Sequence, residues 1–278
     1  MMEVETKRVI GGLPALTNEL IRRFEVIDAL HAQQRMEGIR AQKNNPFGIE
    51  IGKFGRAIAL KASELPSHFF NHVVGLGVPE QDLIGDLLQF YGTTPFAIEL
   101  LPNDINESLA DKLTAHGFRH TQFHAGLFGS AESDDIDDFV EIEKVENPEQ
   151  FSDFLDTNFH GYEIPVSIKE QALSNMQHWI EIPNWHLYLA RVENEPAASA
   201  ILQVGGDLGY LASAATLPGF RKRGLQTALI RRRIAEAEKL GCRLVCSQAQ
   251  FGSSSFHNLE TAGLRLAYLK AIWTRQSV

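Results

Sequence analysis

The chain has 278 residues, of which 44% are hydrophobic, and this is enough for one large domain or two small ones with a buried core. A net charge of −9 argues against a general nucleic-acid binder, and two cysteines in one short stretch argue against a secreted, disulfide-stabilised fold. The N-terminal sequence lacks the apolar run of a signal peptide, and no uncharged apolar stretch is long enough to span a bilayer. We therefore expect a cytoplasmic protein without nucleic-acid or membrane partners.

The charge is unevenly distributed along the chain. Residues 131–210 carry a net charge of −14, and residues 211–278 carry a net charge of +8. A basic segment directly after an acidic one favours a polyanionic ligand at the C-terminal end. A dipolar surface without a ligand would give the same pattern.

The sequence predicts alternating helices and strands in the first half of the chain. Hydrophobic periodicity and turn residues predict a long helix, a hairpin, a strand, a helix, a strand, a helix and a final strand. In chain order these elements cover residues 13–40, 47–52 with 56–61, 68–76, 80–91, 96–101, 105–116 and 118–128.

A small, polar and acidic segment at residues 129–138 predicts a linker, and a similar series of elements follows it. We expect a short strand, two helices, a hairpin, a further strand, a strong helix ended by Gly241, a strand, a short helix and a last strand. Their residues are 139–145, 147–159, 167–179, 185–192 with 197–204, 208–215, 225–240, 243–247, 254–262 and 264–273.

The ends of the two halves resemble each other. LADKLTAHGFRHTQFHAGLF in the first half and HNLETAGLRLAYLKAIW in the second both give a short helix, a glycine and a long strand. Because the elements before them also match in order, we interpret the chain as a tandem repeat of one α/β unit, with domains at residues 1–130 and 131–278.

The segment with the clearest chemistry is TLPGFRKRGLQTAL, residues 216–229. A strand runs into Arg221-Lys222-Arg223-Gly224, and a helix starts at once. The first turn of a helix has free backbone N–H groups and the positive end of the helix dipole, and a glycine lets the backbone approach a phosphate closely. This order of elements predicts an anion site, although a basic, solvated loop is the simpler alternative.

This segment resembles the acetyl-CoA-binding motif of the GNAT superfamily of N-acetyltransferases, and SSSFHNLETAGLRLAY resembles the next motif of that family. The resemblance covers residues 139–278 in element order and is tight over residues 208–273. It implies the acyl-CoA N-acyltransferase fold, a mixed and largely antiparallel α/β sheet flanked by helices, here duplicated in tandem. In the first half, the equivalent loop GLGVPEQ at residues 75–81 has no Arg-x-x-Gly, so we expect that half to be degenerate and not to bind coenzyme A.

The resemblance also implies acetyl-CoA as cosubstrate, direct attack of an amine on the thioester, and no metal. The acceptor would be a small-molecule or peptide amine, and the chain would be a monomer or a homodimer. The positions that the resemblance assigns to acetyl-CoA are Ala214, Ala215, Thr216, Arg221, Lys222, Arg223, Gly224, Leu225, Gln226, Thr227 and Asn258.

Two positions depart from the family pattern. Gln226 stands where a small residue is usual, and Leu259 stands where a tyrosine often protonates the leaving thiolate. Tyr268 and Tyr210 are candidate replacements for that acid, although both also fit as packed strand residues.

The proton of the attacking ammonium also needs an acceptor. Glu163 is a candidate for this role, together with His160, Tyr162 and Asp207. Cys242 and Cys246 are interpreted as core thiols that face one side of a strand. Two other readings stay open: a non-catalytic acyl-CoA-binding or scaffold protein, and transfer to a carrier-bound or alcohol acceptor.

Overall fold

The computed structural model describes residues 9–10, 12–132 and 140–275. The first half contains β1 (Val9–Ile10), β2 (Leu13–Pro14), α1 (Asn18–Arg40), β3 (Ile49–Phe54), β4 (Ala57–Ala62), β5 (His72–Val74), η1 (Val78–Leu83), α2 (Ile84–Tyr91), β6 (Ala97–Leu100), α3 (Glu107–Ala115) and β7 (Phe118–Ser130). The second half contains β8 (Glu141–Lys144), α4 (Pro148–Gly161), η2 (Val166–Ile168), α5 (Lys169–Met176), η3 (Trp179–Glu181), β9 (Trp185–Val192), β10 (Glu195–Gly205), β11 (Leu208–Thr216), η4 (Pro218–Phe220), α6 (Leu225–Lys239), β12 (Leu244–Gln250), α7 (Ser254–Thr261) and β13 (Arg265–Arg275).

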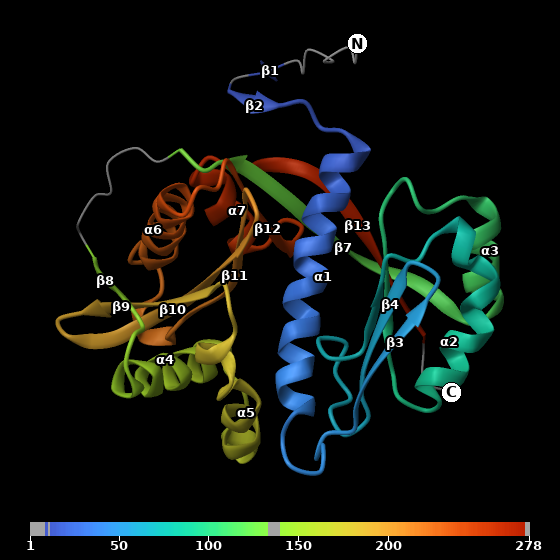
Figure 1. Cartoon of the computed structure of the whole chain (residues 1–278), viewed down its shortest axis with the longest axis horizontal. Helices are drawn as coiled ribbons and strands as arrows, with labels where there is room; N and C mark the ends of the chain where they lie inside the picture. The colour runs from blue at the N-terminus through green and yellow to red at the C-terminus, as the bar shows by residue number, and fades with distance from the viewer. Residues whose placement is uncertain (1–8, 11, 133–139, 276–278) are drawn as a thin grey trace.

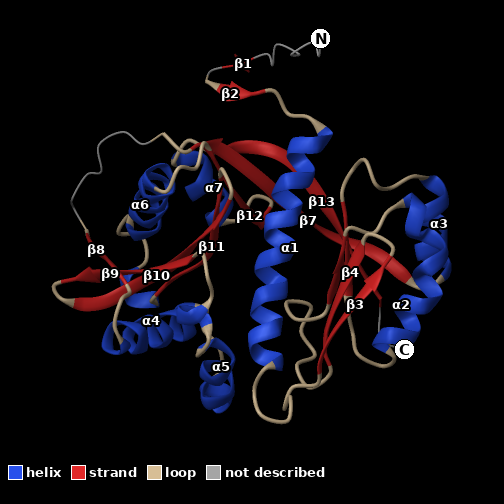
Figure 2. Cartoon of the chain, viewed as in Figure 1, coloured by secondary structure: helices blue, strands red, loops and turns tan. Residues whose placement is uncertain are grey.

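One continuous, mostly antiparallel sheet runs through the molecule, with helices on both faces (Figures 1 and 2). Its strand order is β3-β4-β5-β6-β13-β7-β12-β11-β10-β9-β8. The pairs β5–β6 and β11–β12 are parallel, and they occupy matching places in the two halves. The fold is therefore a mixed α/β fold in which the same order of elements occurs twice.

The last strands of the two halves are exchanged. β13 pairs with β6 of the first half, and β7 pairs with β12 of the second half, while β7 and β13 also pair with each other. Each half thus completes the sheet of the other. The domain boundary near residue 130 stays a prediction, and most of the expected linker lies outside the described residues.

Helix α1 crosses the centre of the molecule and contacts both halves (Figure 1). Its first turns place Phe24 and Ile27 in the core that also holds Phe154 of α4. Its last turns place Met36 and Ile39 in a core with the β3–β4 hairpin. The opposite face of the sheet is covered by α6 and α7 in the second half, and by α2 and α3 in the first.

Most of the expected elements are present, although the helices expected at residues 80–91 and 167–179 are partly 3-10 helix and other details differ. The first long helix begins at Asn18, because the side chain of Thr17 caps it by accepting from the N–H of Leu20. The strand expected at residues 68–76 is limited to His72–Val74. The expectation that the two cysteines face one side is wrong, because Cys242 precedes the strand and lies in the core under α6, whereas Cys246 lies in the core on the other face. Both thiols are buried, as expected of core cysteines.

Candidate active site

The two parallel strands at the centre of the second half separate part-way along. β11 and β12 pair only through Leu208–Leu244, Gly209–Val245 and Tyr210–Cys246. Beyond Tyr210, one edge of β11 continues without a strand partner among the described residues, while its other edge stays paired with β10. Ser213 lies in this stretch with φ of 42°, next to the register shift between β10 and β11. Free backbone groups on an open strand edge can bind an extended ligand.

The free stretch of β11 leads into the loop that starts α6. Gly224 is the N-cap residue, with φ of 77°, and Lys222 has φ of 63°. No side chain caps this helix, so the N–H groups of Leu225, Gln226 and Thr227 lack the intrahelical partners that later residues have. The space beside the Cα atom of Gly224 is open. This is the geometry of a backbone anion site.

The basic residues of the loop hold it against α4. The Nη2 atom of Arg221 donates to the carbonyl of Gly161 at 3.1 Å and pairs with the Glu163 carboxylate at 2.7 Å, and its Nε atom donates to the carbonyl of Thr216 at 3.3 Å. The guanidinium of Arg223 lies 5.2 Å from the ring centroid of Phe220. Lys222 and Arg223 are exposed. The loop thus combines positive charge with free N–H groups.

The predicted cofactor residues on β11 and α6 lie close to one another. Gln226 donates from Nε2 to Oγ1 of Thr216 at 2.7 Å, so its longer side chain ties the end of the strand to the start of the helix. Gly161 packs so tightly on β11 that an added Cβ would lie 2.8 Å from that of Ala215. Asn258 is half-buried on α7, and Leu259 packs in the core at 5% exposure.

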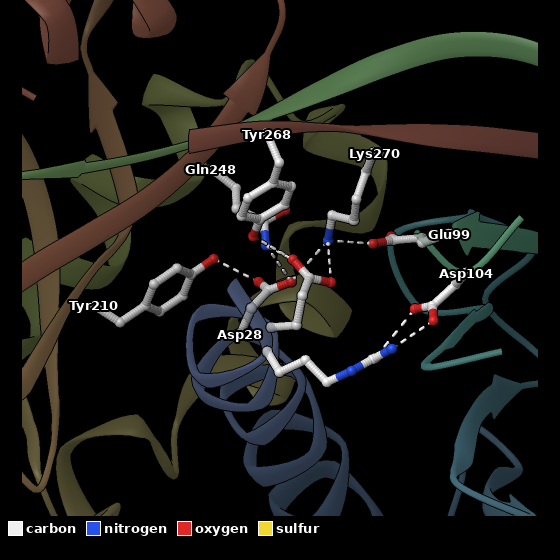
Figure 3. A network of polar contacts seen from close by, with 9 residues as sticks. Asp28, Glu99, Asp104, Tyr210, Gln248, Tyr268 and Lys270 are labelled. Carbon is white, nitrogen blue, oxygen red and sulfur yellow. Dashed lines mark hydrogen bonds and ion pairs between the residues drawn. The ribbon is translucent and has the colours of Figure 1, made fainter. Parts of the chain in front are cut away.

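A buried polar cluster lies between α1 and the sheet, next to the point where β11 and β12 separate. Tyr210 donates its hydroxyl hydrogen to Asp28 at 2.5 Å, and Tyr268 donates its own to Glu25. Gln248, on the separated part of β12, donates to both carboxylates, at 2.8 Å to Asp28 and 3.0 Å to Glu25. Figure 3 shows Tyr210, Gln248 and Tyr268 converging from β11, β12 and β13 on Asp28 of α1.

Lys270 is the cation of this cluster, and its side chain is 1% exposed. Its Nζ atom lies 2.6 Å from Glu99, 3.1 Å from Asp28 and 3.4 Å from Glu25 (Figure 3). Three carboxylates therefore share one buried ammonium. Because strand exchange brings Lys270 of β13 beside Glu99 of β6, the cluster joins the two halves.

The two carboxylates of α1 have pKa values displaced in opposite directions. Burial raises the pKa of Glu25 to about 7, and nearby Asp28 adds to the effect despite the opposing charge of Lys270. Burial also disfavours ionised Asp28, but Lys270 and the Tyr210 hydroxyl outweigh it and hold the pKa of Asp28 below its ordinary value. Burial and the neighbouring carboxylates raise the pKa of Tyr210 and of Tyr268 well above the ordinary value, so both phenols stay protonated.

The other candidate proton acceptors lie outside the central cluster and are paired with basic side chains or exposed to solvent. Glu163 is paired with Arg221 and is largely exposed. Asp207 is bound by Arg243 and Arg23, and the hydrogen bond from Arg243 lowers its pKa. His160 is exposed beside Lys169, and Tyr162 is 51% exposed. In the part of the chain that the structure describes, no group of three or more His, Cys, Asp or Glu side chains is placed to hold a metal ion.

In the first half, the loop equivalent to the one before α6 is filled by charged side chains. The start of η1 is occupied by a buried carboxylate, Glu80, which pairs with Arg56 at 3.1 Å. Arg56 also pairs with Asp104 at 2.7 Å and packs against Gly77. Side chains of the first half therefore fill the region that corresponds to the open space beside Gly224. Its inability to bind coenzyme A stays a prediction.

The sequence analysis missed the carboxylate and lysine members of the central cluster. Glu25 and Asp28 are spaced by three residues on the face of α1 that also carries buried Phe24 and Ile27. Acidic residues inside an apolar helical stripe are an available signal of a buried polar site. Glu99 and Lys270 gave no such signal, because their positions in the strands fit either face.

Comparison with known proteins shows what the second half is similar to. The family model described as the acetyltransferase (GNAT) family matches residues 144–259. No curated protein sequence matches the chain significantly. No helix of the described residues is both long and apolar enough to cross a membrane.

Solved structures match nearly the whole chain at low identity. A GCN5-related N-acetyltransferase from Kribbella flavida is 15% identical with a TM-score of 0.62, and the match covers 90% of this chain and 95% of that one. A tandem GNAT protein from the clavulanic acid biosynthesis pathway is 11% identical with a TM-score of 0.61, over 94% of this chain and 96% of that one. A GCN5-related N-acetyltransferase from Sphaerobacter thermophilus is 13% identical with a TM-score of 0.57, over 91% and 93%. At these identities the similarity concerns the fold.

Proposed function

Because residues 144–259 match the model of the acetyltransferase (GNAT) family, we propose that the chain transfers an acetyl group from acetyl-CoA to a primary amine. The observation that carries the proposal is the uncapped start of α6, where free N–H groups follow Gly224 in a left-handed conformation. Leu225, Gln226 and Thr227 would bind the pyrophosphate through their backbone, and Arg221, Lys222 and Arg223 would add positive charge.

The open edge of β11 fits the rest of the cosubstrate. Acetyl-CoA would supply the acetyl group as a thioester. The backbone of residues 214–216 would pair with its extended arm, and an N–H there would donate to the thioester oxygen as that oxygen gains charge. Asn258 on α7 would contact the arm from the other side. Holding both reactants at the separation of β11 and β12 supplies the attack geometry.

Proton transfer is assigned to the central cluster. In the reaction the amine nitrogen bonds to the thioester carbon, the C–S bond breaks, the sulfur gains a proton and the nitrogen loses one. Tyr210 is the last paired residue before β11 separates, and its raised pKa keeps a proton available for the sulfur. Glu25, with a pKa of about 7, is matched to accepting the proton that the amine loses. Tyr268 would link to this pathway through its hydrogen bond to Glu25.

The anion site is tested by titrating the purified protein with acetyl-CoA in a calorimeter. We expect micromolar binding, and we expect the double change Arg221→Glu/Gly224→Asp to abolish it by adding two negative charges to the loop. Arg231→Glu is the control, because it makes the same charge reversal as Arg221→Glu on the exposed face of α6, beyond its first turn. Absence of binding to the parent protein would refute the proposed activity and leave a scaffold with a GNAT fold.

A non-catalytic acyl-CoA-binding protein is the second candidate. It is favoured by Leu259, which packs into the core at the position where the family pattern often has a tyrosine that protonates the leaving thiolate. The two candidate functions differ in whether acetyl-CoA is consumed when an amine is added. Release of free thiol from acetyl-CoA upon addition of primary amines supports the transferase, whereas tight binding without amine-dependent thiol release supports the binding protein.

A further inference from the structure

Two arginines are almost completely buried in the described residues, and they differ in how they are bound. Arg233 of α6 is 1% exposed and donates to three backbone carbonyls, those of Leu229, Ile201 and Ala212, at 3.0 to 3.1 Å. Arg35 of α1 is 5% exposed. Burial lowers the pKa of both guanidinium groups to about 10.

Arg35 has far fewer partners than Arg233. Within residues 12–132 and 140–275, its side chain donates one hydrogen bond, from Nη2 to the carbonyl of Phe69 at 2.9 Å, and it forms no ion pair. Its Nε atom is buried without a partner. The guanidinium carbon lies 3.7 Å from the ring centroid of Phe69, which stacks on its face. A buried charge without a counterion is costly, so such a group is usually completed by an anion.

The position of Arg35 is on the acceptor side of the proposed site. Arg35 lies one helical turn after His31 on α1, and the His31 ring meets the Tyr210 ring edge-on with the centroids 5.5 Å apart. Tyr210 is the last residue of β11 that pairs with β12 before the strand edge becomes free. Arg35 therefore lies near the place where the acetyl group would be transferred.

The polar groups near Arg35 are also incompletely bound. His178 lies across from α1, and its ring packs directly on Gly38, where an added Cβ would lie 1.9 Å away. The Nε2 atom of His178 is buried without a hydrogen-bond partner. His178 precedes η3 and packs on α1 three residues after Arg35, so the two incompletely bound side chains both lie along the last turns of α1.

We propose that Arg35 binds a carboxylate on the acceptor, so that the substrate is an amine that also carries a carboxylate; this inference rests on the proposed function. A guanidinium presents a planar fork that matches a carboxylate, and stacking on Phe69 fixes the plane of that fork. Asp28 lies seven residues earlier on α1, about 10 Å along the helix axis. The excess of carboxylates around Lys270 would attract the ammonium end of the acceptor, which favours an amino acid with its amine distant from its carboxylate.

The test is direct binding of matched probes to the full chain by calorimetry. 6-Aminohexanoate is compared with hexylamine, and L-phenylalanine with phenethylamine, so that the two pairs separate distant from adjacent amine and carboxylate groups. We expect 6-aminohexanoate to bind about 10-fold to 100-fold more tightly than hexylamine, the range for a hydrogen-bonded charged pair. Arg35→Gln should abolish the preference, and Arg35→Lys should retain only part of it.

The outcomes separate this inference from the proposed function. Acetyl-CoA binding is measured on the same samples and should not change in Arg35→Gln. A carboxylate preference in a protein that does not bind acetyl-CoA refutes the transferase and leaves the Arg35 site. Acetyl-CoA binding without a carboxylate preference in either pair overturns the Arg35 site and leaves the transferase.

A purely structural role for Arg35 is tested by thermal unfolding. Arg233→Met removes three buried hydrogen bonds to backbone carbonyls and should lower Tm by several degrees. Arg35→Met removes an unpaired buried charge and keeps an apolar stem against Phe69, so Tm should be unchanged or higher. A loss in Arg35→Met as large as that in Arg233→Met would overturn the inference, because it would mean that the protein itself uses the charge.

Discussion

Asp28 and Glu25 show how position within one cluster decides the ionisation of a carboxyl group. Asp28 lies 3.1 Å from the Lys270 ammonium and also accepts from Tyr210, so its charged form is stabilised. Glu25 lies farther from Lys270, at 3.4 Å, and its burial is not fully offset. Two carboxyl groups one helical turn apart therefore differ in proton affinity, as is common where a protein performs acid–base chemistry.

Glu25 should make the protein less stable as the pH rises through neutrality. Its pKa is 4.5 ordinarily and about 7 in the folded protein. The folded state thus holds a proton that the unfolded chain has lost between these values. The resulting stabilisation is complete below about pH 4.5 and is lost as the pH rises through 7. We expect the free energy of unfolding of the wild type to exceed that of Glu25→Gln by less as the pH rises. Measured by urea unfolding, this difference should fall by up to about 3 kcal/mol between pH 5 and 8.

Asp207→Asn is the control for this measurement, because Asp207 pairs with Arg243 and Arg23 and is not among the groups that shift the pKa of Glu25. The pKa of Asp207 is lowered in the folded protein, so its contribution is present above about pH 3.8 and is lost only as the pH falls further. The difference between wild type and Asp207→Asn should therefore be constant between pH 5 and 8. A constant difference for Glu25→Gln as well would contradict the raised pKa of Glu25.

For single residues, the sequence identified Tyr210 and Tyr268 as candidate acids but could not identify the residues that they contact. Tyr210 and Asp28 are 182 residues apart in the chain, and Tyr268 and Glu25 are 243 residues apart. No local pattern reports such a contact. The anion loop was predictable because its N–H groups, glycine and basic residues are adjacent in sequence. The roles assigned to all of these residues stay predictions.

The elements with strong periodicity were predicted closely. The helix expected at residues 225–240 is Leu225–Lys239, and the strand expected at 185–192 is Trp185–Val192. The weak predictions were those decided by tertiary contacts. β5 is limited to three residues because it pairs with β4 over His72–Val74 and with β6 only at His72 and Val73. Propensity favours a strand over a longer stretch, but only paired residues form one.

The long strand β13 depends on Lys270 being matched by carboxylates of two other elements. Changing Lys270 to methionine would leave Glu25, Asp28 and Glu99 buried without their cation. We expect the free energy of unfolding to fall by about 3–5 kcal/mol at pH 7, as for other buried ion pairs that lose one partner. Urea unfolding followed by circular dichroism would measure this change.

Lys239→Met is the matched control for that change. Lys239 is 63% exposed and pairs with Glu236 on the surface of α6. An exposed pair contributes little, so this variant should lose less than about 1 kcal/mol. Equal losses in the two variants would show that the central cluster does not stabilise the packing of β13 and α1.

At the scale of the whole molecule, the exchange of β7 and β13 makes the two halves interdependent. The sequence predicted the repeat, because each half shows the same order of periodic segments. It could not predict the exchange, because the alternation of apolar residues in a strand is the same whichever neighbour it pairs with. Helix α1 adds to the interdependence, since it places apolar residues in the cores of both halves.

Neither half should therefore fold alone, although each contains a complete set of elements. A fragment of residues 1–132 would expose the edges of β6 and β7 that pair with β13 and β12, and a fragment of residues 140–278 would expose the opposite edges. Exposed strand edges promote aggregation rather than stable monomers. We expect each fragment to lack a cooperative thermal transition, and their co-expression to restore one. A cooperative transition in either fragment alone would instead make the boundary near residue 130 that of an independent domain, with the exchanged strand adding stability but not deciding the fold.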